Sequence, residues 1–184
     1  NYNGAVNNVL VQSGSGDNYV LLGDASSATG SVQVTLGTGD DTIFVKGLNS
    51  KGNINLGSGS DSFSTLDNSI SGFTLQGGDG TDTITLAENA NAVDSLFQNV
   101  TSVEKINFTG VNSDLTLGAY AQAAGVINVA ANAASGTDVD ISGMSSDVVI
   151  TSGAGSNIIT AGSGANNIST GADDDEHRHH HQGS

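Results

Sequence analysis

The chain has 184 residues, with 26 Gly, no Pro, no Cys and no Trp, and its formal net charge at pH 7 is −15. Only four residues are Lys or Arg, which excludes nucleic acid and anionic membranes as direct partners because both bind basic surface. The absence of Cys excludes disulfides and thiol chemistry, and no apolar run is long enough for direct insertion into a bilayer. The acidic balance favours metal cations as partners instead.

Short strands and Gly-rich turns alternate from about residue 6 to residue 86. Apolar side chains occupy every second position in segments such as SVQVTL (31–36), TIFV (42–45) and NINL (53–56), so one face of each strand points inward. The turns recur after about 20 residues, a period typical of solenoids, in which each coil stacks on its neighbours. The sequence therefore predicts an all-β fold, a parallel β-solenoid of the β-roll or β-helix kind with two strands per coil.

Residues 87–100 (AENANAVDSLFQNV) lack Gly and interrupt this pattern. Their apolar residues follow a helical spacing: Ala90, Val93, Leu96, Phe97 and Val100. We predict a short helix or irregular excursion that covers one side of the solenoid, with Leu96 and Phe97 packed against a coil. Strands are expected to resume at residues 103–108, 115–117, 126–129 and 139–141.

We predict one continuous solenoid domain over residues 1–172. The acidic, His-rich tail at 173–184 (DDDEHRHHHQGS) has the composition of an expression tag or a disordered extension, and the fold prediction leaves it out. A native histidine-rich, metal-binding tail is the alternative interpretation. The chain opens in mid-pattern at Asn1, without Met, which we interpret as the start of a fragment of a longer protein.

The turns that begin at residues 37, 57 and 77 share a frame of two glycines followed by an aspartate. Glycine permits positive φ, so the carbonyl oxygens of such a turn can point into the space between one coil and the next. The aspartate adds a charged oxygen, and Ca²⁺ accepts six to eight oxygen ligands in flexible geometry. One turn has too few oxygens, but two stacked turns have enough, so the repeat predicts several Ca²⁺ sites.

The residues expected to hold these ions are the following: Gly37, Thr38, Gly39, Asp41, Gly57, Ser58, Gly59, Asp61, Gly78, Asp79, Gly80 and Asp82. Asp79, Asp17 and Asp40 lie in the turns but outside the key position. Each of them would either add a ligand or be solvated. Other turns carry Asn in place of the key aspartate, and sites there should be weaker or absent: Asn18, Asn157 and Asn166. In the early coils only one edge has the signature, so Ca²⁺ should line that edge.

The segment GGDGTDTIT (77–85) resembles the Ca²⁺-binding RTX nonapeptide repeat G-G-x-G-x-D-x-U-x, and the turns at 37 and 57 match it except at the first glycine. The order of these turns, the excursion and NVTSVEKINFTG (99–110) is similar to that in RTX-type bacterial surface-layer (S-layer) proteins. This resemblance covers roughly residues 30–172. It implies an RTX-like β-roll stabilised by Ca²⁺, type I secretion, and self-association into a lattice on the extracellular surface of a bacterium.

Two other classes of protein are compatible with the same features. One is an RTX adhesin, or the calcium-binding secretion and folding module of a secreted enzyme. Cell-surface polysaccharide, bound through parts outside this chain, is a further partner that the resemblance allows. A polysaccharide-active β-helix enzyme ranks below these, because no His lies outside the tail to serve as a base for Ser, and few Arg or Lys could bind an acidic substrate. We therefore expect a structural protein without catalytic residues.

Overall fold

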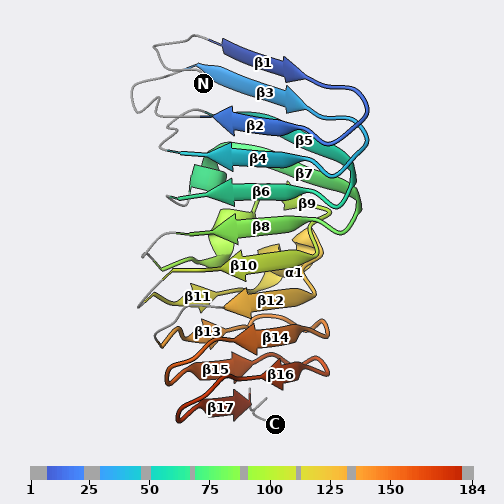
Figure 1. The fold of residues 1–184 in the computed structure, drawn as a ribbon. Helices are drawn as coiled ribbons and strands as arrows, with labels where there is room; N and C mark the ends of the chain where they lie inside the picture. Colours follow the sequence, from blue (N-terminus) through green and yellow to red (C-terminus); the bar gives the residue numbers. More distant parts are fainter. Residues whose placement is uncertain are drawn as a thin grey trace.

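The computed structural model describes residues 8–22, 30–46, 51–66, 69–87, 91–110, 113–131 and 136–179. These residues form an all-β, parallel β-solenoid of about seven turns with very little helix, which confirms the predicted fold class (Figure 1). The coils stack along one axis, and the chain descends this axis from the N-terminal to the C-terminal end.

Three parallel sheets form the walls of the solenoid. The first sheet contains β1 (Asn8–Gln12), β3 (Ser31–Thr35), β5 (Lys51–Gly59), β7 (Phe73–Gly80) and β9 (Val100–Thr101). The second runs the whole length through β2 (Tyr19–Leu22), β4 (Thr42–Val45), β6 (Ser62–Thr65), β8 (Thr83–Leu86), β10 (Lys105–Phe108), β12 (Asn128–Ala131), β14 (Val149–Ser152) and β16 (Asn167–Ser169). The third replaces the first in the C-terminal coils with β11 (Leu115–Thr116), β13 (Val139–Asp140), β15 (Ile158–Ala161) and β17 (Glu176–His179).

The core is built from columns of apolar side chains, one from each coil. In the second sheet the parallel register stacks one such column, whose members are at most 1% exposed: Ile43, Phe63, Ile84, Ile106, Val129 and Ile150. Burying an aliphatic or aromatic side chain of this size contributes roughly 1.5–3 kcal/mol. The alternation of apolar and polar residues in each strand thus fixes which face is inward, and the coil length fixes which residues stack.

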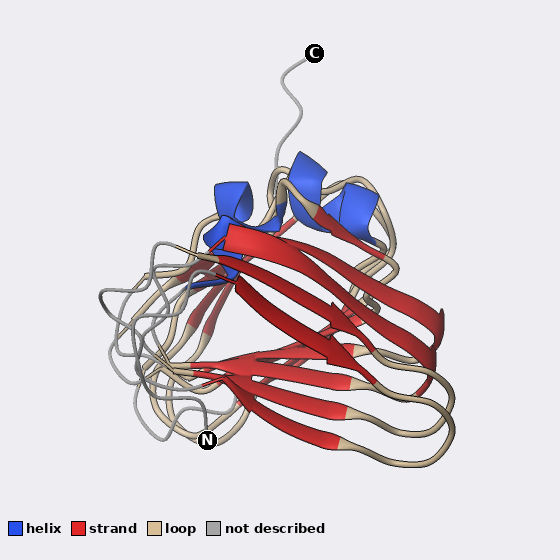
Figure 2. Cartoon of the chain, turned by 90° about the horizontal axis from the view of Figure 1, so that it is seen from above, coloured by secondary structure: helices blue, strands red, loops and turns tan. Residues whose placement is uncertain are grey.

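Helical segments interrupt the first sheet where it gives way to the third. The excursion contains the 3₁₀ helix η2 (Asp94–Phe97), which buries Phe97, so the predicted short helix is confirmed there, while Leu96 is only partly buried. Ala90 lies outside the described residues. A second 3₁₀ helix, η1 (Ser69–Gly72), contacts η2, and Figure 2 shows the helical segments gathered on one side of the solenoid.

Helix α1 (Ala119–Ala124) was not predicted from the sequence. The carboxylate of Asp94, from the preceding coil, accepts hydrogen bonds from the backbone N–H groups of Gly118 (2.8 Å), Tyr120 (3.1 Å) and Ala121 (2.9 Å). These are donors that a helix start leaves without partners inside the helix. A residue distant in sequence therefore supplies the cap.

The solenoid continues past residue 172. Strand β17 pairs in parallel with β15, with Ile158 opposite Glu176 and Ala161 opposite His179. Residues 176–179, which the sequence prediction left out of the fold, therefore belong to the last coil of the third sheet. Residues 180–184 lie outside the described residues.

Stacked glycines set the spacing of the N-terminal coils. Gly57, Gly59, Gly78 and Gly80 all have positive φ, between 112° and 145°. A Cβ on Gly78 would strike the carbonyl oxygen of Gly57 in the coil before, and a Cβ on Gly80 would strike that of Gly59. Any side chain at these positions would separate the two coils.

Replacing Gly78 with Ala is expected to lower the free energy of unfolding in Ca²⁺ by roughly 2–5 kcal/mol, from positive-φ strain and overpacking. Gly14 occupies the equivalent place in the first coil, where a Cβ meets nothing within 4 Å, so Gly14→Ala should change stability by no more than about 0.5 kcal/mol. Denaturant unfolding of both variants tests this. Equal effects would contradict the role assigned to glycine stacking.

Candidate cation-binding edge

The Gly-Asp turns stack at the edge where the chain passes from the first sheet to the second. Strands β5 and β7 run into the turns, so that Gly57 pairs with Gly78, Ser58 with Asp79 and Gly59 with Gly80. An isolated bridge places Thr38 beside Ser58 in the same way. The structure therefore brings the predicted turns together in register along one edge.

A ladder of side chains runs down this edge on its inner side. Asn18 N–H donates to Asp41 Oδ1 (2.7 Å), Asp41 N–H to Asp61 Oδ1 (2.7 Å), and Asp61 N–H to Asp82 Oδ1 (2.9 Å). Asp82 N–H in turn donates to Glu104 Oε2 (2.9 Å). Each carboxylate thus binds the backbone of the coil before it, and four acidic side chains follow one another in consecutive coils.

The three aspartates of this ladder are buried, with exposed fractions of 1% for Asp41, 2% for Asp61 and 0% for Asp82. Their second carboxylate oxygens, Oδ2, are buried too and have no hydrogen-bond partner. Burial raises the pKa of Asp61 and raises that of Asp82 to about 6; the backbone hydrogen bonds oppose this, and neighbouring carboxylates reinforce it. The edge therefore carries negative charge that no described protein group compensates.

The turns with Asn in the key position show how this place can be satisfied without charge. Asn157 Oδ1 accepts a hydrogen bond from Thr137 N–H (2.8 Å), as the aspartates do from their preceding coils. The other atom of the amide, Nδ2, donates to the carbonyl oxygens of its own turn, Gly155 O at 2.6 Å and Gly153 O at 3.2 Å. The amide donor thus binds two glycine carbonyls.

Asn166 repeats this arrangement, with Oδ1 accepting from Val148 N–H (3.1 Å) and Nδ2 donating to Gly162 O (3.1 Å) and Gly164 O (3.0 Å). In the acidic turns the carboxylate oxygen Oδ2 takes the place of this amide nitrogen in the sequence frame G-x-G-x-D. The backbone of these turns differs as well, because Gly57 and Gly78 have positive φ whereas Gly153 and Gly162 do not. A buried carboxylate oxygen without a hydrogen-bond donor needs a positive partner, which a cation or a proton supplies.

The chemistry of the acidic turns fits Ca²⁺, because their donors are carboxylate and carbonyl oxygens. Within the described part of the chain, no three His, Cys, Asp or Glu side chains gather closely enough to hold a metal by themselves. A bound ion would therefore need carbonyl ligands beside the carboxylate.

Comparisons of the chain with protein family models, curated proteins and solved structures found no match. None of the described helices is long and apolar enough to cross a membrane.

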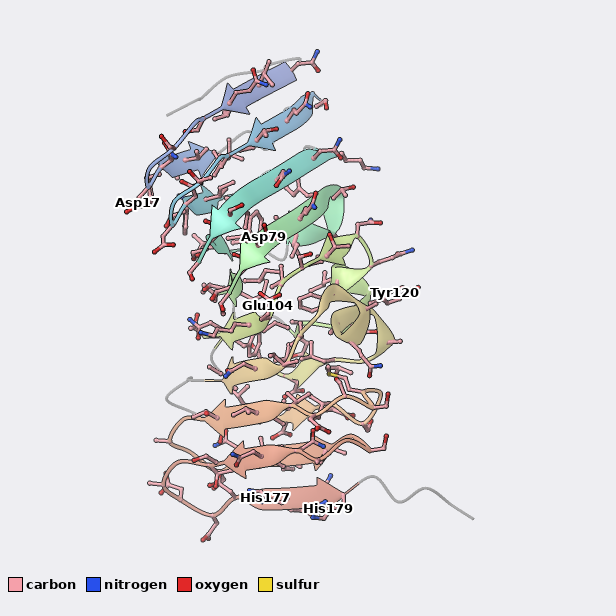
Figure 3. All side chains as sticks on the ribbon, turned by 90° about the vertical axis from the view of Figure 1, so that its right-hand side faces the viewer. Asp17, Asp79, Glu104, Tyr120, His177 and His179 are labelled. Atoms are coloured by element: carbon pink, nitrogen blue, oxygen red, sulfur yellow. The ribbon has the colours of Figure 1, made fainter. Side chains whose placement is uncertain are left out.

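A second row of side chains lies on the outer side of the turns. Asp17 Oδ1 accepts a hydrogen bond from Asp40 N–H (2.9 Å), and Asp40 Oδ1 accepts one from Ser60 N–H (2.7 Å). Asp79 is exposed on the next turn, where it is in register with Ser58, and Figure 3 shows Asp79 below Asp17. Unlike the inner ladder, these outer carboxylates are open to water.

Two acidic residues that accept hydrogen bonds from the coil before them were not predicted from the sequence. Glu104 lacks the G-x-G frame, and only its position 22 residues after Asp82 places it in the acidic row. Asp175 lies on the opposite edge, where it accepts hydrogen bonds from the backbone N–H (3.0 Å) and Nδ2 (3.2 Å) of Asn157. The 18-residue interval between Asn157 and Asp175 is a signal in the sequence, but Asp175 lies in the tail that the fold prediction leaves out.

The raised pKa values predict that the metal-free protein, kept in a chelator, becomes less stable as the pH rises. A carboxyl whose folded-state pKa exceeds its unfolded value stabilises the fold most below the unfolded pKa, 3.8 for Asp82, and loses that effect as pH rises through about 6. We expect stability to fall by up to about 3 kcal/mol across this range through Asp82. Asp61 and Glu104 carry the charges that face it.

Chemical unfolding of the metal-free protein measures this change, from pH 4 up to the highest pH at which the acidic coils remain folded. Asp82→Asn is the matched variant, because it removes the titrating group and keeps the acceptor oxygen. A profile that this variant leaves unaltered would contradict the assignment to Asp82.

Proposed function

We propose that the chain is a Ca²⁺-stabilised structural solenoid, a segment of a bacterial S-layer lattice. The observation that carries the proposal is the column of Asp41, Asp61 and Asp82, each buried with one unpartnered carboxylate oxygen. Three such charges in consecutive coils are compatible with a stable fold only if cations or protons accompany them. The resemblance to RTX-type S-layer proteins adds support from the sequence.

The donor set favours Ca²⁺ over other biological metals. Zn²⁺ prefers Cys and His, whereas the described histidines, His177 and His179, lie exposed on β17, far along the chain from the acidic ladder. Mg²⁺ requires near-octahedral geometry and retains several waters, while Ca²⁺ accepts an irregular cage of carboxylates and carbonyls. Asp41, Asp61 and Asp82, with glycine carbonyls of the stacked turns, would hold the ions.

Cation dependence also suggests where the protein folds. Extracellular Ca²⁺ modules commonly bind with dissociation constants of about 0.1–1 mM, so their sites stay empty in the cytoplasm and fill outside the cell. A chain with a net charge of −15 and uncompensated buried carboxylates would remain unfolded before export and fold on the cell surface. This property suits passage through a type I secretion system.

A lattice subunit should assemble into sheets under conditions in which a secretion or adhesion module stays monomeric. Purified protein in Ca²⁺, imaged by negative-stain electron microscopy, is expected to form ordered two-dimensional sheets that disperse in chelator. Magnesium at the same concentration serves as the control. Protein that folds in Ca²⁺ yet stays monomeric would overturn the lattice role and favour the RTX adhesin or the folding module of a secreted enzyme.

A further inference from the structure

The turn at 77–82 differs from the turns above it at Gly77. The register of β5 and β7 places Gly77 in line with Leu56, and that of β3 and β5 places Leu56 in line with Leu36. Both leucines are buried, with exposed fractions of 1% and 3%. At the fourth coil, glycine therefore stands where the second and third coils each bury a leucine.

Two oxygen atoms lie where a side chain on Gly77 would be. A Cβ built on Gly77 would strike the backbone oxygen of Ser102 and would lie 2.5 Å from Asp82 Oδ2. Asp82 is fully buried, and this Oδ2 has no hydrogen-bond partner. A carbonyl oxygen and an unpartnered carboxylate oxygen thus converge beside Gly77, inside the edge.

The fifth coil adds a second carboxylate close by. Glu104 Oε2 accepts the hydrogen bond of Asp82 N–H (2.9 Å), which holds the Glu104 side chain against the turn. Ser102 has a φ of 52°, in the left-handed region that non-glycine residues rarely adopt. Backbone in such regions is often found at ligand sites, and here it accompanies a carbonyl oxygen directed at Gly77.

We propose that Asp82 Oδ2, Ser102 O and the Glu104 carboxylate hold a further Ca²⁺ beside Gly77, between the fourth and fifth coils. This inference rests on the proposed function, but it assigns a site whose lower half lies outside any glycine-aspartate turn. Gly77 has no side chain to keep the oxygens of Ser102 and Asp82 apart. Asp82 and Glu104 provide two negative charges, and Ser102 provides a neutral oxygen. Water completes the six to eight ligands that Ca²⁺ requires.

Calorimetric titration of the full chain with Ca²⁺ tests the site, with Glu104→Gln as the informative variant. Gln keeps an oxygen that can accept the Asp82 N–H bond, so a merely structural role for Glu104 would survive the change. We expect the variant to lose one bound Ca²⁺ per chain, or to bind one ion roughly tenfold more weakly, because affinity follows ligand charge. Asp147→Asn is the matched control, since Asp147 accepts a hydrogen bond from Ala165 N–H (2.7 Å) in the C-terminal coils.

Circular dichroism in saturating Ca²⁺ shows whether each variant is folded. Gly77→Ala would push Ser102 O and Asp82 Oδ2 apart and should remove the same ion. If wild-type protein binds Ca²⁺ but Glu104→Gln binds it with unchanged stoichiometry and affinity, this site is overturned and the proposed function stands. If wild-type protein binds no Ca²⁺, both fail.

Discussion

Chelation of Ca²⁺ at neutral pH is expected to unfold the N-terminal coils of the solenoid. An ionised, uncompensated carboxylate buried in a protein costs several kcal/mol, whereas a whole domain is stable by about 5–15 kcal/mol. Asp41, Asp61 and Asp82 together therefore carry a cost comparable to the total stability. Without a cation, the coils from about residue 8 to residue 110 should lose their packing.

The C-terminal coils should be less sensitive to chelator. Asn157 and Asn166 satisfy their own turns with amide donors, and none of the described carboxylates in these coils is buried. Circular dichroism in a Ca²⁺ chelator should show loss of most of the β signal, and excess Ca²⁺ should restore it. Hydrogen exchange should place the first loss of protection in the acidic coils. A spectrum unchanged at full chelation would count heavily against a cation role for the ladder.

The fold could be predicted because its strongest determinants are local. Alternation in segments such as Thr42–Val45 identifies the inward face, and paired glycines identify turns that need positive φ, which Gly57, Gly59, Gly78 and Gly80 have. Helix α1 was missed because its cap, Asp94, is supplied by the coil before it. A pattern search along the chain does not detect a contact between residues 24 to 27 positions apart.

The candidate site was predictable only in part, for a similar reason. Spacing within a turn located Asp41, Asp61 and Asp82, but their burial and the unpartnered oxygens emerge from stacking. Glu104 joins the ladder through the register between β8 and β10, and no turn motif marks it. The sequence also showed Asn at some key positions, but not that the amide nitrogen binds glycine carbonyls.

The hydrogen bonds of the Asn157 amide suggest a way to remove the dependence of folding on Ca²⁺. A protein in which Asp41, Asp61 and Asp82 are all replaced by Asn is expected to fold without Ca²⁺. Each Asn keeps the Oδ1 acceptor for the preceding coil and places an N–H₂ donor where the unpartnered oxygen lies, as Asn157 does. The formal net charge changes from −15 to −15 + 3 = −12, so most of the acidity remains.

Thermal unfolding with and without chelator measures the effect. The Tm of the triple Asn variant should be the same in both conditions and near that of the Ca²⁺-loaded wild type, while the Tm of the wild type should fall steeply in chelator. The matched control replaces Asp41, Asp61 and Asp82 with Ala, which removes the same charge but supplies no donor and leaves the backbone N–H groups of the preceding coils unpaired. Each buried unpaired group costs about 1–3 kcal/mol, so the Ala variant should be unstable in both conditions. If the Asn variant still requires Ca²⁺, or is no more stable than the Ala variant, the amide does not substitute for the ion and the ladder is not a row of cation sites.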